Sequence, residues 1–374
     1  MVIIGDVQYW KVRVPMKPDT VNSPEWGPAG FDEVPKFIIR LRTDEGLEGL
    51  GETARGEREE DVARWAEHLR GLDPLALNWQ DLPAPGAGFG LVGQESQKYP
   101  PRPHEPRFSW DRVYDAVEMA IYDLVGKALG LPVYKLLGGG WRDRVLVDYW
   151  VGRMSPADCA RKAREAAAQG FQGLKMKCAL EDPMVERVQA IAEAAGPDFR
   201  ITIDPNERFY RPAEAIRLAR ELEGYNVEVF EDPFPKWNVD WYVLFRQKTT
   251  VPVAMHLGDP RDVITAIKRE AVDYFNLAGP MASFVKVAAI ADAAGIPCWH
   301  GSGVDLGIRD ASYVHACAAA RSCTLASDII GNFLREDDLI VEPLRIERGY
   351  AVVPQGPGLG VHLDAAALEH YRVR

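Results

Sequence analysis

Apolar residues follow two different periods along this chain. Up to about residue 55 they alternate with polar residues, which is typical of half-buried strands, and Asp44-Glu45-Gly46 predicts a hairpin turn. Residues 59–72 and 110–129 carry apolar positions three and four residues apart, which predicts two amphipathic helices. From about residue 145 onward, short apolar runs alternate with segments rich in Ala, Arg and Glu. This second pattern predicts a repeated strand–helix unit.

Eight apolar runs of the repeat predict eight strands, at residues 145–151, 173–178, 200–204, 227–231, 251–256, 272–277, 296–300 and 324–328. Eight strand–helix units over roughly 200 residues are typical of a (β/α)8 TIM barrel. We therefore expect an α/β protein with three parts. These are an α+β capping domain at residues 1–140, a catalytic barrel at residues 141–340, and a C-terminal segment at residues 341–374 that returns to the cap.

Two segments rich in Pro and Gly interrupt the predicted cap, at residues 17–30 and 83–107. A loop of this length in a compact domain is usually a lid or a binding loop. We expect both loops to determine specificity, together with side chains at the barrel mouth such as Trp150.

Composition excludes several classes of function. The 374 residues carry a net charge of −11, which argues against nucleic-acid binding because phosphate neutralisation needs a basic surface. No apolar run approaches the roughly 18 residues of a membrane span, and the first residues lack the features of a signal peptide. The five scattered cysteines form no CxxC pair, so we expect buried, reduced thiols. These features favour a cytoplasmic protein.

Chemically active residues gather at the C-terminal ends of the predicted strands, where barrel enzymes have their active sites. In chain order they are Lys175 and Lys177, Asp204 with Asn206, Glu231, His256 with Asp259, Asn276, His300 and Asp328. The two lysines are two residues apart, so both point to the same face of their strand.

The carboxylates of Asp204 and Glu231 suit Mg²⁺, which prefers oxygen ligands. A carboxylate substrate chelated to this ion has a more acidic α-proton. A lysine beside positive charge has a lowered pKa and can act as a base near neutral pH. The residues therefore predict a metal site with a lysine base beside it, acting on a small carboxylate.

Each of these residues also has an ordinary structural explanation. A lysine at a strand end can be solvated, Asp204 can cap a helix, and Glu231 can pair with a barrel lysine. His256 and His300, taken singly, are more often histidines of a core. Their combination on one rim favours the functional interpretation.

With this combination of residues, the chain resembles the mandelate racemase/muconate-lactonizing group of the enolase superfamily. The resemblance rests on the K-x-K sequence at 175–177, the strands that end in Asp204 and in Glu231-Asp232-Pro233, and the tail sequence Gly356-Pro-Gly-Leu-Gly360. It covers essentially the whole length and implies a modified barrel with an α+β cap. It also implies a flexible loop, here residues 17–30 with Trp26, that closes over the substrate.

The resemblance implies that Asp204 and Glu231 bind one Mg²⁺ ion, for which Mn²⁺ is a possible substitute. Lys177 would be the base and Lys175 would contact the substrate carboxylate. Asp328 occupies the acidic position of the last strand, near the substrate carboxylate. The family commonly forms dimers or octamers, so we expect a homo-oligomer.

The chain departs from the family pattern at two strands. The third metal ligand is usually acidic, but its position here is His256, as in some acid-sugar dehydratases, with Asp259 as the alternative ligand. Ala278 stands where cycloisomerases and dipeptide epimerases have a lysine and where mandelate racemases have an aspartate. His300 lies one residue before the position of the racemase histidine.

These departures favour a dehydratase. A pair of opposed lysines is excluded, and dehydration needs one base, Lys177, and a separate acid such as His300. We expect dehydration of a sugar acid or other hydroxy acid. A racemase, epimerase or cycloisomerase of the same superfamily is the alternative, and a non-catalytic barrel that binds metal or ligand is the alternative of another class. The expected substrate-binding residues are Trp26, Asn206, Asp328, Tyr149 and Arg309.

Overall fold

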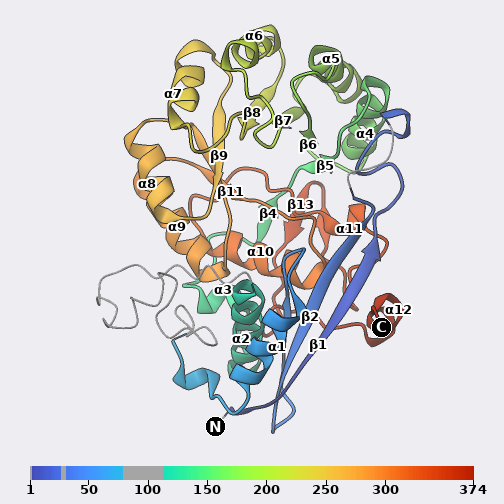
Figure 1. The fold of residues 1–374 in the computed structure, drawn as a ribbon, viewed down its shortest axis with the longest axis vertical. Coiled ribbons are helices and arrows are strands. Elements are labelled where there is room, and N and C mark those ends of the chain that lie inside the picture. The colour runs from blue at the N-terminus through green and yellow to red at the C-terminus, as the bar shows by residue number, and fades with distance from the viewer. Residues whose placement is uncertain (1, 27–30, 79–112) are drawn as a thin grey trace.

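The computed structural model describes residues 2–26, 31–78 and 113–374. In this part of the chain an antiparallel sheet with its helices lies at one end of a curled parallel sheet, and a ring of helices covers the outside of the parallel sheet (Figure 1). The predicted 83–107 loop falls outside the described residues, and no helix among those described is long and apolar enough to cross a membrane.

The N-terminal sheet has the order β1-β2-β3, with the predicted hairpin between β2 and β3. One face packs against two helices. A Cβ on Gly49 or Gly51 would lie 2.2 or 2.1 Å from a backbone oxygen of the second helix, so only glycine permits this close packing. The elements are β1 (Ile4–Pro15), η1 (Pro24–Trp26), β2 (Glu33–Thr43), β3 (Glu48–Glu52), α1 (Glu59–Leu69), η2 (Pro74–Ala76) and α2 (Tyr114–Leu129).

The parallel sheet has seven strands in the order β11-β10-β9-β8-β7-β6-β5 among the described residues. Its strands are β5 (Tyr149–Val151), β6 (Gly173–Lys177), β7 (Arg200–Asp204), β8 (Val227–Glu231), β9 (Val253–Leu257), β10 (Tyr274–Leu277) and β11 (Cys298–His300). Its helices are α4 (Pro156–Ala168), α5 (Met184–Ala195), α6 (Pro212–Leu222), α7 (Val239–Lys248), α8 (Pro260–Lys268), α9 (Met281–Ala293) and α10 (Gly307–Ala319).

Side chains of the parallel strands alternate between the barrel interior and the helices. Val229, Ala254 and Trp299 form one buried cluster although they come from β8, β9 and β11. Because β8 and β11 are not neighbours in the sheet, these side chains can meet only inside the barrel. This cluster fixes which positions of each strand face inward.

Two of the eight predicted strands differ from the structure. The run 145–151 divides into β4 (Arg144–Leu146), which belongs to another sheet, and β5 of the barrel. Residues 324–328 form no regular strand: among the described residues the bridges on either side are isolated ones, at Cys298–Cys323 and Val147–Ser327. The barrel is therefore a modified one that closes through single bridges.

The C-terminal segment forms a small sheet, β12-β13-β4, and a last helix beside β1. An antiparallel bridge joins Arg372 to Val12, and the Val373 amide donates to the Lys11 carbonyl over 2.8 Å. The exact domain boundaries stay a prediction. The remaining elements are α3 (Val133–Leu136), α11 (Gly331–Leu334), β12 (Ile346–Glu347), β13 (Tyr350–Val352) and α12 (Ala365–Tyr371).

Candidate active site

Three buried carboxylates surround the ammonium group of Lys175. Its Nζ lies 3.1 Å from Asp204 Oδ2, 2.8 Å from Glu231 Oε2 and 3.2 Å from Asp328 Oδ2. The parallel strands β6, β7 and β8 bring their carboxyl ends to one rim, so residues far apart in sequence meet there. The structure therefore brings together four of the residues that the sequence placed on this rim.

The carboxylates govern the protonation of this cluster. Burial alone would lower the pKa of Lys175, but Asp328, Glu231 and Asp204 outweigh burial and raise this pKa well above its ordinary value. Burial, reinforced by the nearby Asp204 charge, raises the pKa of Glu231 to about 8. For Asp204, burial is outweighed by Lys177 and Lys175, which lower its pKa. The sequence led us to expect a lowered lysine pKa, whereas the carboxylates set the opposite direction for Lys175.

Lys177 is the more accessible of the two lysines. Its side chain is 22% exposed against 5% for Lys175, and it pairs with Asp204. Both lysines line a cavity of about 1090 Å³ at the barrel mouth. Lys177 can therefore meet a ligand in the cavity, while Lys175 holds the carboxylates beneath it.

The cavity draws its walls from the cap and from the barrel strand ends. Of the predicted residues, its lining includes Trp26, Lys175, Lys177, Asn206, Glu231 and His256. Among the polar residues of the lining that had no assigned role in the sequence interpretation are Arg55, Arg153, Arg208 and Asn276. Trp150 lines the cavity as expected for a side chain at the barrel mouth.

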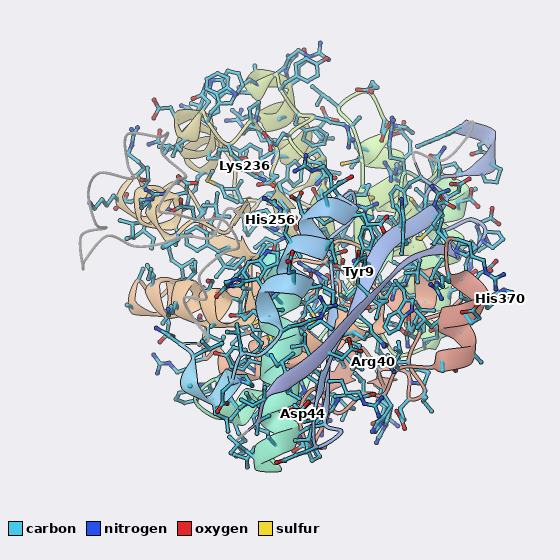
Figure 2. The ribbon with its side chains drawn as sticks, turned by 60° about the horizontal axis from the view of Figure 1, so that its bottom comes forward. Tyr9, Arg40, Asp44, Lys236, His256 and His370 are labelled. Atoms are coloured by element: carbon cyan, nitrogen blue, oxygen red, sulfur yellow. The ribbon has the colours of Figure 1, made fainter. Side chains whose placement is uncertain are left out.

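Glu231, Asp232 and His256 form a group that could hold a metal ion, since their donor atoms all lie within 4.8 Å of one another. Burial, followed by Lys236, lowers the pKa of His256 to about 3, so its imidazole is neutral and can act as a ligand. The His256 amide donates to Asp232 Oδ1 over 2.8 Å, and Lys236 pairs with the other oxygen over 2.9 Å. Figure 2 shows His256 and Lys236 in the same part of the molecule.

Asp232 was missed as a member of this group because its position depends on a local backbone feature. Its φ of 43° is in the left-handed region, where few non-glycine residues occur. Asp259, the alternative ligand of the sequence interpretation, does not belong to the group because it caps α8, accepting from the Arg261 amide over 2.8 Å.

One buried oxygen beside this group, Asn276 Oδ1, has no hydrogen-bond donor within the described part of the chain. Glu231 Oε2 pairs with the Lys175 ammonium over 2.8 Å. Asn276 Nδ2 donates to Glu231 Oε1 over 2.8 Å, which places both residues together. Buried acceptors without donors are costly. Two carboxylates, a neutral imidazole and the free amide oxygen of Asn276 form a donor set that fits Mg²⁺ or Mn²⁺.

His300 does not occupy the position that the sequence suggested, and its role needs correction. Trp299 faces the barrel interior, so His300 faces the helices, with ring centroids 4.4 Å from Phe284 and 4.0 Å from Tyr313. Burial lowers the pKa of His300 to about 4, and its Nδ1 lies 2.6 Å from the Gly301 carbonyl. His300 is thus a neutral core histidine outside the cavity lining and not the expected general acid.

The next inward position after Trp299 belongs to Gly301. A Cβ at this residue would lie 2.6 Å from Asn276 Oδ1 and 3.0 Å from the His256 ring. At this inward position the barrel therefore has no side chain that could act as an acid.

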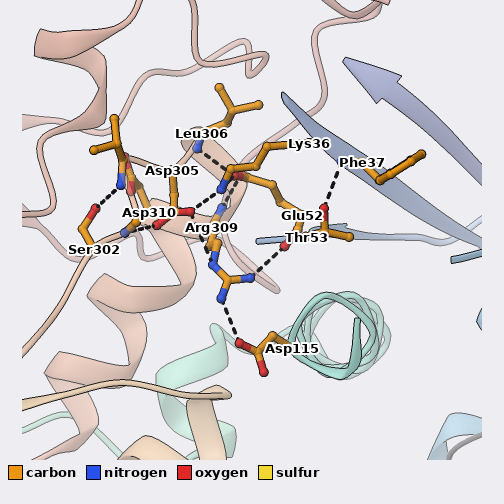
Figure 3. Close-up of polar contacts among 12 residues, drawn as sticks. Lys36, Phe37, Glu52, Thr53, Asp115, Ser302, Asp305, Leu306, Arg309 and Asp310 are labelled. Atoms are coloured by element: carbon orange, nitrogen blue, oxygen red, sulfur yellow. Dashed lines mark hydrogen bonds and ion pairs between the residues drawn. The ribbon is translucent and has the colours of Figure 1, made fainter. Parts of the chain in front are cut away.

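Tyr149 and Arg309 also lie away from the main cavity lining, contrary to their expected roles in substrate binding. Tyr149 faces outward from β5 and packs edge-on against Phe171, with ring centroids 5.2 Å apart. Arg309 donates to Asp115 of α2 over 2.8 Å and to the Glu52 carbonyl over 3.1 Å, so it joins the barrel to the cap (Figure 3).

The other expected substrate-binding residues lie at or beside the cavity. Asn206 lines it, and its amide donates to Asp204 Oδ1 over 3.0 Å. Trp26 lines it from the N-terminal loop. Asp328 lies below it, where its Oδ1 accepts from the Ser302 amide over 3.0 Å.

Comparison with known proteins identifies the family. A model of the enolase C-terminal domain-like family matches residues 158–367, which is more than half of the chain. The chain therefore belongs to the enolase superfamily, in its mandelate racemase/muconate cycloisomerase group. Its fold and the residues at the barrel mouth agree with this assignment.

The relatives catalyse more than one reaction. The N-succinyl-L-Arg/Lys racemase of Bacillus cereus is 26% identical over 387 residues, covering 99% of this chain and 98% of the racemase. The D-xylonate dehydratase of Haloferax volcanii is 29% identical over 371 residues, covering 91% of this chain and 86% of the dehydratase. A solved isomerase from Streptomyces coelicolor A3(2) superposes with a TM-score of 0.78 at 27% identity, covering 99% of both chains. Epimerases and cycloisomerases are also among the relatives, so both lyases and isomerases are represented.

Proposed function

We propose that this protein removes the α-proton of a small carboxylate substrate with the help of Mg²⁺, and that it dehydrates a sugar acid or another hydroxy acid. The observation that carries this proposal is that both lysines of the cavity lining lie on one strand, β6. Lys177 lines the cavity beside the acidic cluster, while the ends of β10 and β11 present Asn276 and Gly301.

Racemisation requires an acid or base on each face of the reacting carbon, whereas dehydration requires proton removal and protonation of the leaving hydroxyl. The placement of His300 in the core leaves Lys177 as the side chain suited to both steps. Lys177 takes the proton from the α-carbon, and its ammonium returns this proton to the departing β-hydroxyl, which leaves as water. The resulting enol rearranges to a 2-keto acid, so atoms and charge balance.

The metal would be held by Asp204, Glu231 and His256, with Asp232 beside them. When bound, Mg²⁺ would polarise the substrate carboxylate and make the α-proton more acidic. A solved dipeptide epimerase from Enterococcus faecalis V583 with this fold is described as complexed with Mg and a dipeptide. Lys175 would contact the substrate carboxylate and Asp328 would hold Lys175 in place, since these two side chains already pair.

The proposal is tested with a panel of aldonic and aldaric acids that includes D-xylonate and D-gluconate, on which two of the relatives act by name. The protein is first treated with a chelator and then assayed with and without added Mg²⁺ for a 2-keto product. Product that depends on Mg²⁺ supports the proposal. Turnover that is equal without the metal would contradict the metal role.

An isomerase is the second candidate, because racemases, epimerases and cycloisomerases are similar to this chain over most of its length. In D₂O, such an enzyme would exchange the α-proton of its substrate or isomerise it without loss of water. If the panel yields neither product nor exchange while Mg²⁺ binds, the protein is instead a metal-binding barrel without this activity.

A further inference from the structure

Trp26, in the loop that lines the cavity, lies against two arginines that share one carboxylate. The guanidinium carbons of Arg153 and Arg187 each lie 5.7 Å from the centre of the Trp26 ring. Arg187 Nη1 donates to Asp182 Oδ2 over 3.0 Å, and Arg153 pairs with both oxygens of the same carboxylate. A cation within about 6 Å of an indole ring is attracted to it. The N-terminal loop is thereby attached to the barrel wall.

Arg187 makes one further contact, and this contact leads to the candidate base. Its Nη2 donates to the carbonyl oxygen of Lys177 over 2.9 Å. Lys177 is the last residue of β6, so this guanidinium holds the backbone from which the lysine side chain projects.

The burial of Arg187 makes this arrangement specific. The residue is 0% exposed, although it stands on α5 among apolar core residues. A buried guanidinium is costly where its donors lack partners. Asp182 and the Lys177 carbonyl accept from the two Nη atoms and Trp26 lies over the same group, while Nε has no hydrogen-bond partner among the described residues.

We propose that Arg187 is a positioning residue that links the docking of Trp26 to the placement of Lys177. The planar guanidinium has fixed donor directions, so it can hold the Lys177 carbonyl only while Asp182 and Trp26 fix its own orientation. This inference rests on the proposed role of Lys177 as the base. The N-terminal loop then has two effects. It lines the cavity, and it restricts the position of the Lys177 side chain.

Four variants test the link with the sugar acid that the wild type turns over fastest. Arg187→Met should lower kcat by about 100-fold with little change in KM, because a small displacement of a reacting group is enough for such a loss. Trp26→Leu should lower kcat as well. The double variant should be no slower than Arg187→Met alone, since both changes break one chain of contacts. Trp237→Leu, at a tryptophan that is 79% exposed and outside the cavity lining, is the matched control and should leave kcat unchanged.

Multiplicative losses in the double variant would overturn the link, as would an unchanged kcat in folded Arg187→Met. If Arg187→Met does not fold, Arg187→Lys replaces it. Lysine keeps the charge beside Asp182 but lacks the second fixed donor, so kcat should still fall at constant KM, and an unchanged kcat overturns the proposal.

Failure of the proposed function is recognised separately. It appears as a wild type that turns over no sugar acid, before any variant is compared. In that case, the urea midpoints of the same single and double variants report the Trp26–Arg187 contact without substrate. Additive shifts of the midpoint would then overturn the link.

Discussion

Two groups of buried ions in this protein have the same charges and different surroundings. At the barrel mouth, Lys175 and Lys177 face Asp204, Glu231 and Asp328. At the junction of cap and barrel, Lys36 and Arg309 face Glu52, Asp305 and Asp115 (Figure 3). Each group has two cations and three carboxylates, so charge alone does not distinguish them.

The difference lies in the hydrogen bonds that the carboxylates accept. Both oxygens of Glu52 accept from backbone amides, of Leu306 over 2.7 Å and of Arg309 over 2.9 Å. Glu231 at the barrel mouth lines a cavity, and its partners are side chains, the Lys175 ammonium and the Asn276 amide. A closed group whose central carboxylate is held by backbone donors stabilises the fold, whereas an open group whose central carboxylate is held by side chains and lines a cavity can receive a ligand. The comparison therefore predicts opposite outcomes for equivalent substitutions.

The largest effect on activity is expected at the barrel mouth. Lys177→Ala removes the proposed base and should lower kcat by about 10²–10⁴-fold, the range for loss of a general base. The urea midpoint should change little, because the side chain is part-exposed. Steady-state kinetics and urea unfolding measure the two quantities, and retained turnover would show that Lys177 is not the base.

The equivalent change at the cap–barrel junction should act on stability. Lys36→Met leaves Glu52 and Asp305 buried without their cation and should lower the free energy of unfolding by about 3–5 kcal/mol. Both partner side chains are at most 2% exposed. Arg64→Met, at a surface pair with Asp61, is the matched control and should cost less than about 1 kcal/mol. Equal losses in the two variants would contradict the assignment of this junction as a stabilising group.

A smaller change should disturb the open group from the opposite wall. Gly301→Ala places a methyl group 2.6 Å from Asn276 Oδ1, so Asn276 must move away from Glu231. We expect an activity loss of about tenfold and an unfolding penalty of about 1–3 kcal/mol, as for other overpacked sites. A folded variant with full activity would show that the position of Asn276 does not matter to the reaction.

The smallest effect concerns a buried carboxylate that relies on backbone donors. Glu118 accepts from the Ala282 amide over 3.2 Å, and burial, followed by Asp115, raises its pKa to about 8 from an ordinary 4.5. The folded state then holds a proton that the unfolded chain has lost, so stability should fall as the pH rises from about 4.5 to about 8. Glu118→Gln should reduce this fall by about 1 kcal/mol or more. Urea unfolding of both proteins at pH 5 and pH 8 measures this fall in stability. An equal pH dependence in wild type and Glu118→Gln would contradict the raised pKa of Glu118.

The sequence predicted the barrel, the cap and the centre of the site where the strands are long enough to show their period. Lys175 and Lys177 share one face of a five-residue strand, and Asp204 and Glu231 end two others, so their meeting followed from the topology.

The seventh strand, β11, is too short for its inward and outward faces to be assigned from the alternation of its residues. A slip of one residue in a strand moves every side chain to the opposite face. In the three residues of β11, the sequence pattern favoured His300 over Trp299 as the inward residue. Tyr149 was placed at the barrel mouth for a related reason. Its predicted strand divides into two, and in the second part Tyr149 faces outward. Asp232 could not be found from residue spacing, since its place depends on one positive φ angle.

The segment 324–328 gives the barrel a local weakness. Regular strands protect their amide protons from exchange with solvent through continuous ladders, but among the described residues this segment has a single bridge of its own, at Ser327, and another at the preceding Cys323. Its amides should therefore exchange through local openings that need far less free energy than global unfolding. Asp328 belongs to this segment, so such an opening would move one of the three carboxylates that pair with Lys175.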